Sequence, residues 1–271
     1  MDSSVKLPDG GSIAYSVDSG LASWQQPTAT LVMHHGVGFN RDAWRQWLPQ
    51  LIGAGYKVVR VDMRGHGDSV RPASGYRWTT EQFLDDLNAV LDAEGIERTH
   101  FVGESWGGTI GLAWAAKFPA RVQSLSVMST TYDGALVPMI DGFAELIRKE
   151  GIERWTRVMN EARFFPDADP NVLDWAYKAQ VDCTPYVIAE IFQYILTQSI
   201  EKQLATIEVP VQILAPQGSP FVKPSLAYEL RNRLKDCEMD IFPGHRHGLV
   251  LSGAHLACDS MMNFIRRRFP K

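Results

Sequence analysis

A serine between glycines near the middle of the chain has the type and spacing of a nucleophile. Residues 103–108 read GESWGG, with Ser105 at the centre of a G-x-S-x-G pattern. The preceding THFV is typical of a strand, and the following TIGLAWAAKF is typical of a helix. A strained turn between the two would lift the serine hydroxyl into a cleft, and small residues let the backbone segments approach there. We therefore predict that Ser105 is a nucleophile, against the alternative of a glycine-rich turn with an idle serine.

A base for this serine is offered late in the chain, because a serine hydroxyl is a weak nucleophile until an imidazole removes its proton. Residues 242–248 read FPGHRHG and contain His245 and His247. His247 fits better, since a strand followed by PGxxH puts it on the loop that faces the serine turn. The two histidines could also be half of a metal site, but no matching cluster of carboxylates and histidines accompanies them. We predict His247 as general base and acid, and no metal.

The loop at residues 33–38, MHHGVG, follows the first predicted core strand. A glycine-rich loop of this kind can aim backbone N–H groups at one point, and the oxyanion of an acyl transfer needs two such donors. The amides of Val37 and Trp106 are our candidates, against the alternative of a plain tight turn. We interpret His34 and His35 as residues that position the loop rather than as metal ligands.

The elements that must position these residues alternate between strand-like and helix-like patterns. Between the second and third strand-like runs, Thr79 and Gln82 are spaced as a capping box and Gly95 suits a helix end. Such alternation predicts crossover units and a mainly parallel sheet, hence an α/β fold. The strand-like runs are ATLVMHH (29–35), YKVVRVD (56–62), THFVGES (99–105), VQSLSVMS (122–129), VPVQILA (209–215) and EMDIFPG (238–244).

From about residue 134 to 199 the pattern changes to four helix-like segments with no strand-like run. Two of them are divided by Gly151, and the other two open with Pro170 and Pro185 at the first helical position. We predict a helical cap inserted into the core. The expected division is a first core part (1–132), a helical cap (133–204) and a second core part (205–271).

Composition excludes several function classes. The 271 residues are 45% hydrophobic and 21% charged with a net charge of -4, so no broad attraction to nucleic acid or anionic lipid is expected. No stretch approaches the ~20 apolar residues of a membrane span, and the N-terminus lacks a signal-peptide pattern, which predicts a cytoplasmic protein. Three cysteines without CxxC spacing indicate neither a disulfide framework nor a zinc site. A small-molecule substrate is the expected partner, with a homodimer allowed.

Taken together, these motifs resemble the α/β-hydrolase superfamily over nearly the whole chain. The matching pieces stand in the superfamily's order, with a helical cap in its usual place. The resemblance implies an α/β-hydrolase fold, no cofactor, Ser105 as nucleophile, His247 as base, and Val37 and Trp106 as oxyanion donors. Residues 77–108 look most similar to 3-oxoadipate enol-lactonases and related small-molecule hydrolases. The pieces that carry the resemblance are HHGVG, VDMRGHGDS (61–69), GESWGG, VPVQILA and FPGHRHG.

One departure concerns the acid of the triad, which fixes the histidine tautomer and stabilises the imidazolium. In the superfamily the turn after the strand at 209–215 usually carries an aspartate, and Ser219 stands there instead. Some members carry the acid after the preceding core strand, at a position that Ser129 or Thr130 fills here. Asp133 lies a few residues further on, and we predict it as the acid.

Alternatives to Asp133 remain open at this point. Asp133 could be a turn-forming residue, and a serine–histidine pair could be assisted by Ser219, Gln217 or a backbone carbonyl. Glu104, beside the nucleophile, is expected to point away from His247.

The cap should roof an apolar pocket of small-molecule size. Arginines could clamp a substrate carboxylate there; Arg41 and Arg157 are our candidates, with Arg154 and Arg163 also considered. The loop residues His35 and Gly36 complete the candidate substrate-binding set. The polar side chains of Asp62, Arg64, His66 and Asp68 are expected to hold their own loop and to do no chemistry.

The function predicted is that of a cofactor-independent serine hydrolase acting on an ester, lactone or related acyl bond of a small metabolite, with or without a carboxylate. Two alternatives share the same motifs. One is a C–C bond hydrolase or cofactor-free oxygenase with the same site, and the other is a ligand-binding protein that has lost the acid and does not turn over.

Overall fold

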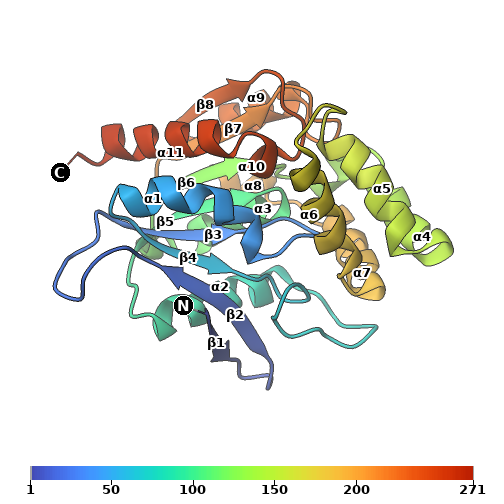
Figure 1. The fold of residues 1–271 in the computed structure, drawn as a ribbon, viewed down its shortest axis with the longest axis horizontal. Helices are drawn as coiled ribbons and strands as arrows, with labels where there is room; N and C mark the ends of the chain where they lie inside the picture. The colour runs from blue at the N-terminus through green and yellow to red at the C-terminus, as the bar shows by residue number, and fades with distance from the viewer. Residues whose placement is uncertain (1, 271) are drawn as a thin grey trace.

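The central feature of the computed structural model, which describes residues 2–270, is one eight-stranded sheet (Figure 1). Its strand order is β1-β2-β4-β3-β5-β6-β7-β8, and β2 pairs antiparallel with both β1 and β4 while all other pairs are parallel. The predicted mainly parallel sheet is confirmed. The strands are β1 (Asp2–Lys6), β2 (Ser12–Asp18), β3 (Thr30–His34), β4 (Lys57–Val61), β5 (Thr99–Glu104), β6 (Val122–Met128), β7 (Val211–Pro216) and β8 (Cys237–Phe242).

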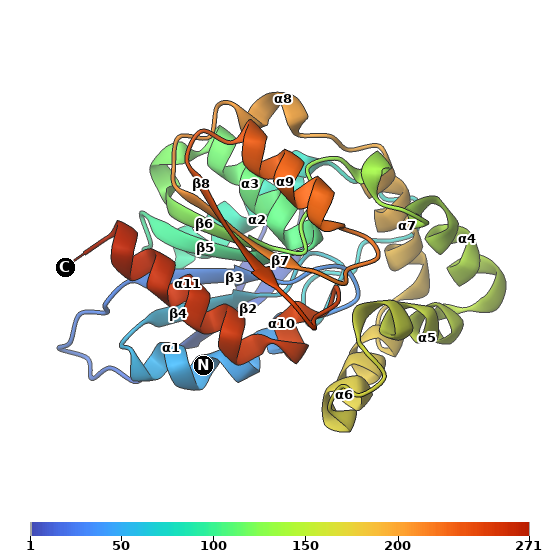
Figure 2. The same ribbon diagram turned by 90° about the horizontal axis from the view of Figure 1, so that it is seen from above.

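Helices cover both faces of this sheet, as Figure 2 shows. On one face lie α1, α10 and α11, and on the other lie α2, α3 and α9. Every residue of β5 and of β7 is buried, which is what two covered faces require of a central parallel strand. The core helices are α1 (Leu48–Gly53), α2 (Thr80–Ala93), α3 (Trp106–Lys117), α8 (Glu201–Leu204), α9 (Pro224–Arg233), α10 (Leu249–Ser252) and α11 (Ala254–Arg268), with short 3-10 helices at Arg41–Trp47, Pro119–Arg121 and Gly134–Leu136.

The predicted capping box at the start of α2 is confirmed. The Thr79 side chain accepts a hydrogen bond from the Gln82 amide, and the Gln82 side chain accepts one from the Thr79 amide. These bonds satisfy amides that have no partner inside the helix. The helix buries its apolar stripe beside α3, the helix that begins at the serine turn.

Four helices between β6 and β7 form a block at one end of the sheet (Figures 1 and 2). The segments that bound this block are joined to each other, because the Gly134 amide donates to Gln198 O (2.9 Å) and the Ile200 amide donates to Tyr132 O (2.9 Å). These bonds close the base of the block, and further hydrogen bonds, such as that from the Gly248 amide to Arg163 O, also join it to the core. Its helices are α4 (Ile140–Glu150), α5 (Ile152–Arg163), α6 (Pro170–Val181) and α7 (Pro185–Leu196).

None of the helices in residues 2–270 has the length and apolar character to cross a membrane.

Candidate active site

Ser105 lies at the sharp turn between β5 and α3, with φ 53° and ψ -122°. This strained conformation is the one expected of a nucleophile elbow. The turn is closed by the Ser105 amide, which donates to Met128 O of the neighbouring strand at 2.9 Å. Glycine is a steric need here, because a Cβ at Gly103 would stand 2.7 Å from Gly107 O. The GESWGG pattern is therefore explained by close backbone approach as well as by the exposed hydroxyl.

His247 meets the serine from the loop after β8. Its Nε2 lies 3.2 Å from Ser105 Oγ, which is within hydrogen-bond reach for proton transfer. Burial, and then the nearby Arg163 cation, lowers the pKa of His247 to about 3. The imidazole is therefore neutral near pH 7 and can accept a proton. The ring is held edge-on by Phe221, with centroids 5.0 Å apart.

The other ring nitrogen of His247 has a serine as its partner. Nδ1 lies 3.1 Å from Ser219 Oγ, and the same oxygen accepts a hydrogen bond from the Val222 amide at 3.1 Å. Ser129, the residue that follows β6, donates its hydroxyl proton to the backbone oxygen of His247 at 2.9 Å. Both positions that could have carried an acid are thus serines in contact with the histidine.

The structure does not support the prediction that Asp133 is the acid of the triad. Its carboxylate accepts a hydrogen bond from the Ala135 amide at 2.8 Å and caps the 3-10 helix at Gly134–Leu136. It makes no hydrogen bond to His247 in the described part of the chain. The turn-forming alternative describes this residue, because its carboxylate caps a local amide while Nδ1 of His247 pairs with Ser219 instead.

The two residues predicted to supply the oxyanion donors line the same pocket as the serine. Val37, on the loop after β3, and Trp106, the first residue of α3, line one pocket with Ser105. Neither amide donates to another protein group within residues 2–270. For Trp106 this follows from its place in the first helical turn, whose amides have no partner inside the helix. Two unpaired N–H groups beside a nucleophile can bind an oxyanion.

His35 and Gly36 hold the oxyanion loop instead of lining the pocket. The Met63 amide donates to Nε2 of His35 at 3.0 Å, so the ring proton is on Nδ1, which donates to Gly36 O at 2.7 Å. The neighbouring Gly38 amide donates to Nε2 of His66 at 3.1 Å. The prediction that His35 positions the loop is confirmed, whereas its assignment with Gly36 as substrate-binding is not supported.

The arginines selected from the sequence also lie outside the pocket. Arg41 forms ion pairs with Asp62 and Asp68, within the polar loop that was expected to be structural. Arg157 is exposed on α5 and stacks over the Tyr177 ring. Neither lines the space next to the nucleophile.

Arg163 is the arginine that reaches the pocket. It is the last residue of α5 and is 2% exposed. Its Nη2 donates to Val37 O at 2.7 Å and its Nη1 donates to Gln180 Oε1 at 2.9 Å, while Nε has no hydrogen-bond partner. Its backbone oxygen accepts from the Gly248 amide at 2.9 Å, next to the catalytic histidine. Arg163 therefore links the cap, the oxyanion loop and the histidine loop.

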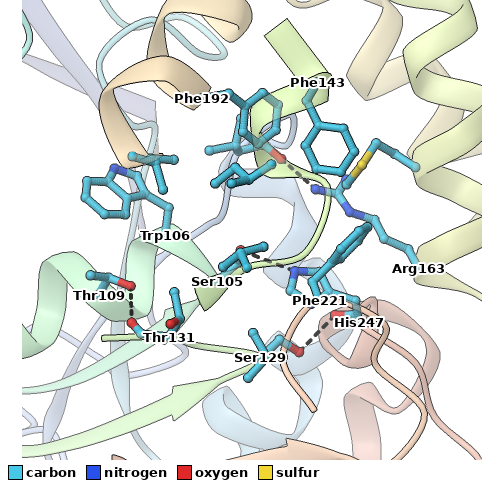
Figure 3. Close-up of a pocket in the computed structure, with 16 residues that line it drawn as sticks. Ser105, Trp106, Thr109, Ser129, Thr131, Phe143, Arg163, Phe192, Phe221 and His247 are labelled. Atoms are coloured by element: carbon cyan, nitrogen blue, oxygen red, sulfur yellow. Dashed lines mark hydrogen bonds between the residues drawn. The ribbon is translucent and has the colours of Figure 1, made fainter. Parts of the chain in front are cut away.

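The pocket itself is mainly apolar and partly open to solvent, with a cavity volume of about 50 Å³. Figure 3 shows Trp106, Phe143, Phe192 and Phe221 around Ser105, with the Arg163 guanidinium on one side. Aliphatic side chains from the cap and from the loop after β7 complete the lining; these are Val137, Ile140, Met159, Ile195 and Val222. The apolar character of this lining suits a small, largely apolar group.

The side chain of Glu104 was expected to point away from His247, and this prediction was wrong. Its Oε2 accepts a hydrogen bond from the Gly36 amide at 2.8 Å, and its Oε1 lies 3.9 Å from Nε2 of His247. Oε1 has no hydrogen-bond partner, and the residue is 0% exposed. Burial raises the pKa of Glu104 to about 7, although the Arg163 charge and the Gly36 amide oppose the rise.

Within residues 2–270 no group of three or more histidine, cysteine, aspartate or glutamate side chains is arranged to hold a metal ion.

The chain is similar in sequence to known proteins. Residues 29–174, more than half of the chain, match the model of a family described as the alpha/beta hydrolase fold. Over 265 residues the chain is 28% identical to a protein of Caulobacter sp. (strain K31) that carries the name of a carbamate hydrolase; the match covers 93% of this chain and 94% of that protein.

Two solved structures show the likeness of the fold. The enol-lactonase from Burkholderia xenovorans LB400 matches with a TM-score of 0.86 at 22% identity, over 95% of this chain and 97% of that one. The esterase from Exiguobacterium antarcticum matches with a TM-score of 0.88 at 18% identity, over 98% and 100% of the two chains. At these identities the match concerns the fold alone.

Proposed function

Because the chain belongs to the alpha/beta hydrolase fold family, we propose that it is a serine hydrolase that cleaves an ester, lactone or related acyl bond through Ser105 and His247. The observation that carries the proposal is the 3.2 Å contact between Ser105 Oγ and Nε2 of His247 at a strained strand-to-helix turn. A neutral imidazole at this distance can remove the hydroxyl proton as the oxygen attacks a carbonyl.

The reaction would proceed in two halves. Ser105 Oγ forms a bond to the carbonyl carbon while its proton passes to Nε2, and the resulting oxyanion is bound by the amides of Val37 and Trp106. The C–O bond to the leaving group then breaks, and the leaving oxygen takes the proton from Nε2. Water attacks the acyl-enzyme, gives a proton to Nε2 and releases the acid, and that proton returns to Ser105. No cofactor takes part in this scheme.

The substrate proposed is a small acyl compound with an apolar body and a carboxylate. The apolar lining supports the first feature, and the free Nε of the buried Arg163 supports the second. The names of the similar proteins, a carbamate hydrolase, an enol-lactonase and an esterase, support an acyl bond as the target.

A second candidate function is ligand binding without turnover. One observation favours it: Ser219 takes the place of the carboxylate that normally orients the histidine. The retained contact between Ser105 and His247 favours catalysis instead.

Hydrolysis assays separate these two functions. The wild type would be assayed with p-nitrophenyl acetate and butyrate, with five- and six-membered lactones, and with the monoester and diester of adipic acid. We expect turnover that is lost in Ser105→Ala and in His247→Gln. Binding of small carboxylates by a folded wild type without turnover of any of these compounds would contradict the hydrolase proposal.

A further inference from the structure

The carboxyl group of Glu104 is fully buried directly beside the nucleophile. One oxygen is used to hold the Gly36 amide, and the other, Oε1, has no hydrogen-bond partner. An unpaired buried carboxylate is costly, because its hydration is lost without full compensation. Its nearest positively charged partner in the reaction would be Nε2 of His247, 3.9 Å away.

The other groups around His247 offer no negative charge that could stabilise a positively charged ring. Burial, and then the Arg163 cation from the cap, lowers the pKa of the ring and so opposes a positive charge on it. Ser219, on the Nδ1 side, contributes a neutral hydroxyl, and Phe221 contributes an apolar ring. Glu104 therefore carries the negative charge that can offset the imidazolium formed during acyl transfer.

We propose that Glu104 stabilises the His247 imidazolium from the Nε2 side, replacing the carboxylate that position 219 lacks on the Nδ1 side. The inference rests on the proposed serine hydrolase function. A full positive charge on the ring interacts with the carboxylate more strongly than the dipole of the neutral ring does, so the effect is larger in the transition state than in the ground state. Glu104 takes up no proton: the proton moves from Ser105 Oγ to Nε2 and then to the leaving group.

A pH dependence follows from this arrangement, because Glu104 acts only when it is ionised. The groups that face it are the Arg163 cation, the Gly36 amide and the His247 ring. With a pKa of about 7, Glu104 loses its charge as the pH falls through neutrality. His247, with a pKa of about 3, does not become protonated in the same range. We therefore expect kcat/KM to decline below about pH 7 as Glu104 becomes protonated.

The test combines Glu104→Gln with Ser219→Asp. Glutamine keeps an oxygen for the Gly36 amide and removes the charge, so the loop is preserved. With p-nitrophenyl acetate, and with the rate of fluorophosphonate labelling as a second readout, we expect Glu104→Gln to lower the rate about 10- to 100-fold in the wild-type background. In the Ser219→Asp background we expect a loss of less than about threefold, because a second carboxylate already compensates the ring. The decline of kcat/KM below about pH 7 should disappear in Glu104→Gln.

Equal losses in the two backgrounds, with the pH-dependent decline of kcat/KM unchanged, would overturn the inference and leave Glu104 as a residue that only holds the loop. This outcome requires an active wild type, so it leaves the serine hydrolase proposal intact. A wild type that neither hydrolyses the ester nor reacts with the fluorophosphonate contradicts both proposals. If Glu104→Gln fails to fold, the pH profile of kcat/KM of the wild type decides alone. A profile that does not decline near pH 7 would exclude an effect of the Glu104 charge on His247.

Discussion

The hydroxyl oxygen of Ser219 lies 3.1 Å from Nδ1 of His247, where a carboxylate would hold the ring proton on Nδ1. A carboxylate can only accept that proton, and it therefore leaves Nε2 free to act as a base. A hydroxyl can either accept from Nδ1 or donate to it. When Ser219 donates, the ring proton moves to Nε2, which then cannot take the proton of Ser105. The protein thus keeps the serine and histidine of a hydrolase, but the tautomer of His247 is less constrained than it would be beside a carboxylate.

Restoring the carboxylate should raise activity. We expect Ser219→Asp to increase kcat on p-nitrophenyl esters by about 10- to 1,000-fold, within the roughly 10⁴-fold that the acid is worth in a complete triad. Ser219→Asn has the same size without the charge and should give no increase. Steady-state kinetics of the two variants measure this, and an Asp variant no faster than the wild type would show that the histidine is already correctly oriented.

Neutralising Asp133 should have little effect on catalysis. Its carboxylate accepts the Ala135 amide, and asparagine caps a turn about as well as aspartate does. The rate of fluorophosphonate labelling of Asp133→Asn should stay within about twofold of the wild type. A loss of a hundredfold or more in a folded variant would mean that Asp133 reaches the histidine during the reaction.

The buried carboxylate should reduce stability at alkaline pH. The folded-state pKa of Glu104 is raised to about 7 from the ordinary value of 4.5, so the folded protein binds this proton more tightly than the unfolded chain. Its ionisation therefore costs stability as the pH rises from about 4.5 to 7, on the order of 3 kcal/mol in total. Glu104→Gln should have a higher free energy of unfolding than the wild type at pH 8, and the two should converge below pH 4.5. Urea denaturation at both pH values checks this, and a variant less stable at pH 8 would contradict it.

Removing the Arg163 guanidinium should disturb the oxyanion loop. Arg163→Met loses the hydrogen bond to Val37 O and should lower kcat/KM about 10- to 100-fold on neutral esters. An additional rise in KM is expected for the adipate monoester if its carboxylate binds Nε. Arg157→Met, on the exposed side of the same helix, serves as the matched control and should change neither parameter by more than about twofold. Equal values of kcat/KM and KM in the two variants would show that Arg163 has no role in the active site.

Most of the fold is predictable from the sequence because its signals are local. The apolar runs of β3 to β7 and the capping box at Thr79 depend on residues close in the chain. The pair Ser105 and His247 was also predictable, since each lies in a contiguous motif after a strand. β1, with the sequence DSSVK, is a partly exposed edge strand without an apolar run, and no local signal singled it out.

The environment of the histidine could not be predicted in the same way. The partner of Nδ1 depends on how the loops after β6, β7 and β8 meet, which spacing alone does not determine. The direction of Glu104 was misjudged because neighbouring strand residues normally point to opposite faces. The positive φ of Ser105 breaks that alternation, and both side chains approach His247.

The most direct test of the serine mechanism is intact-mass analysis after treatment with a fluorophosphonate, which reacts with activated serines. We predict one adduct per chain on the wild type, located at Ser105, and no adduct on Ser105→Ala under the same conditions. A folded wild type that stays unmodified, or an equal rate of labelling in Ser105→Ala, would contradict the assignment of Ser105 and His247 as the catalytic pair.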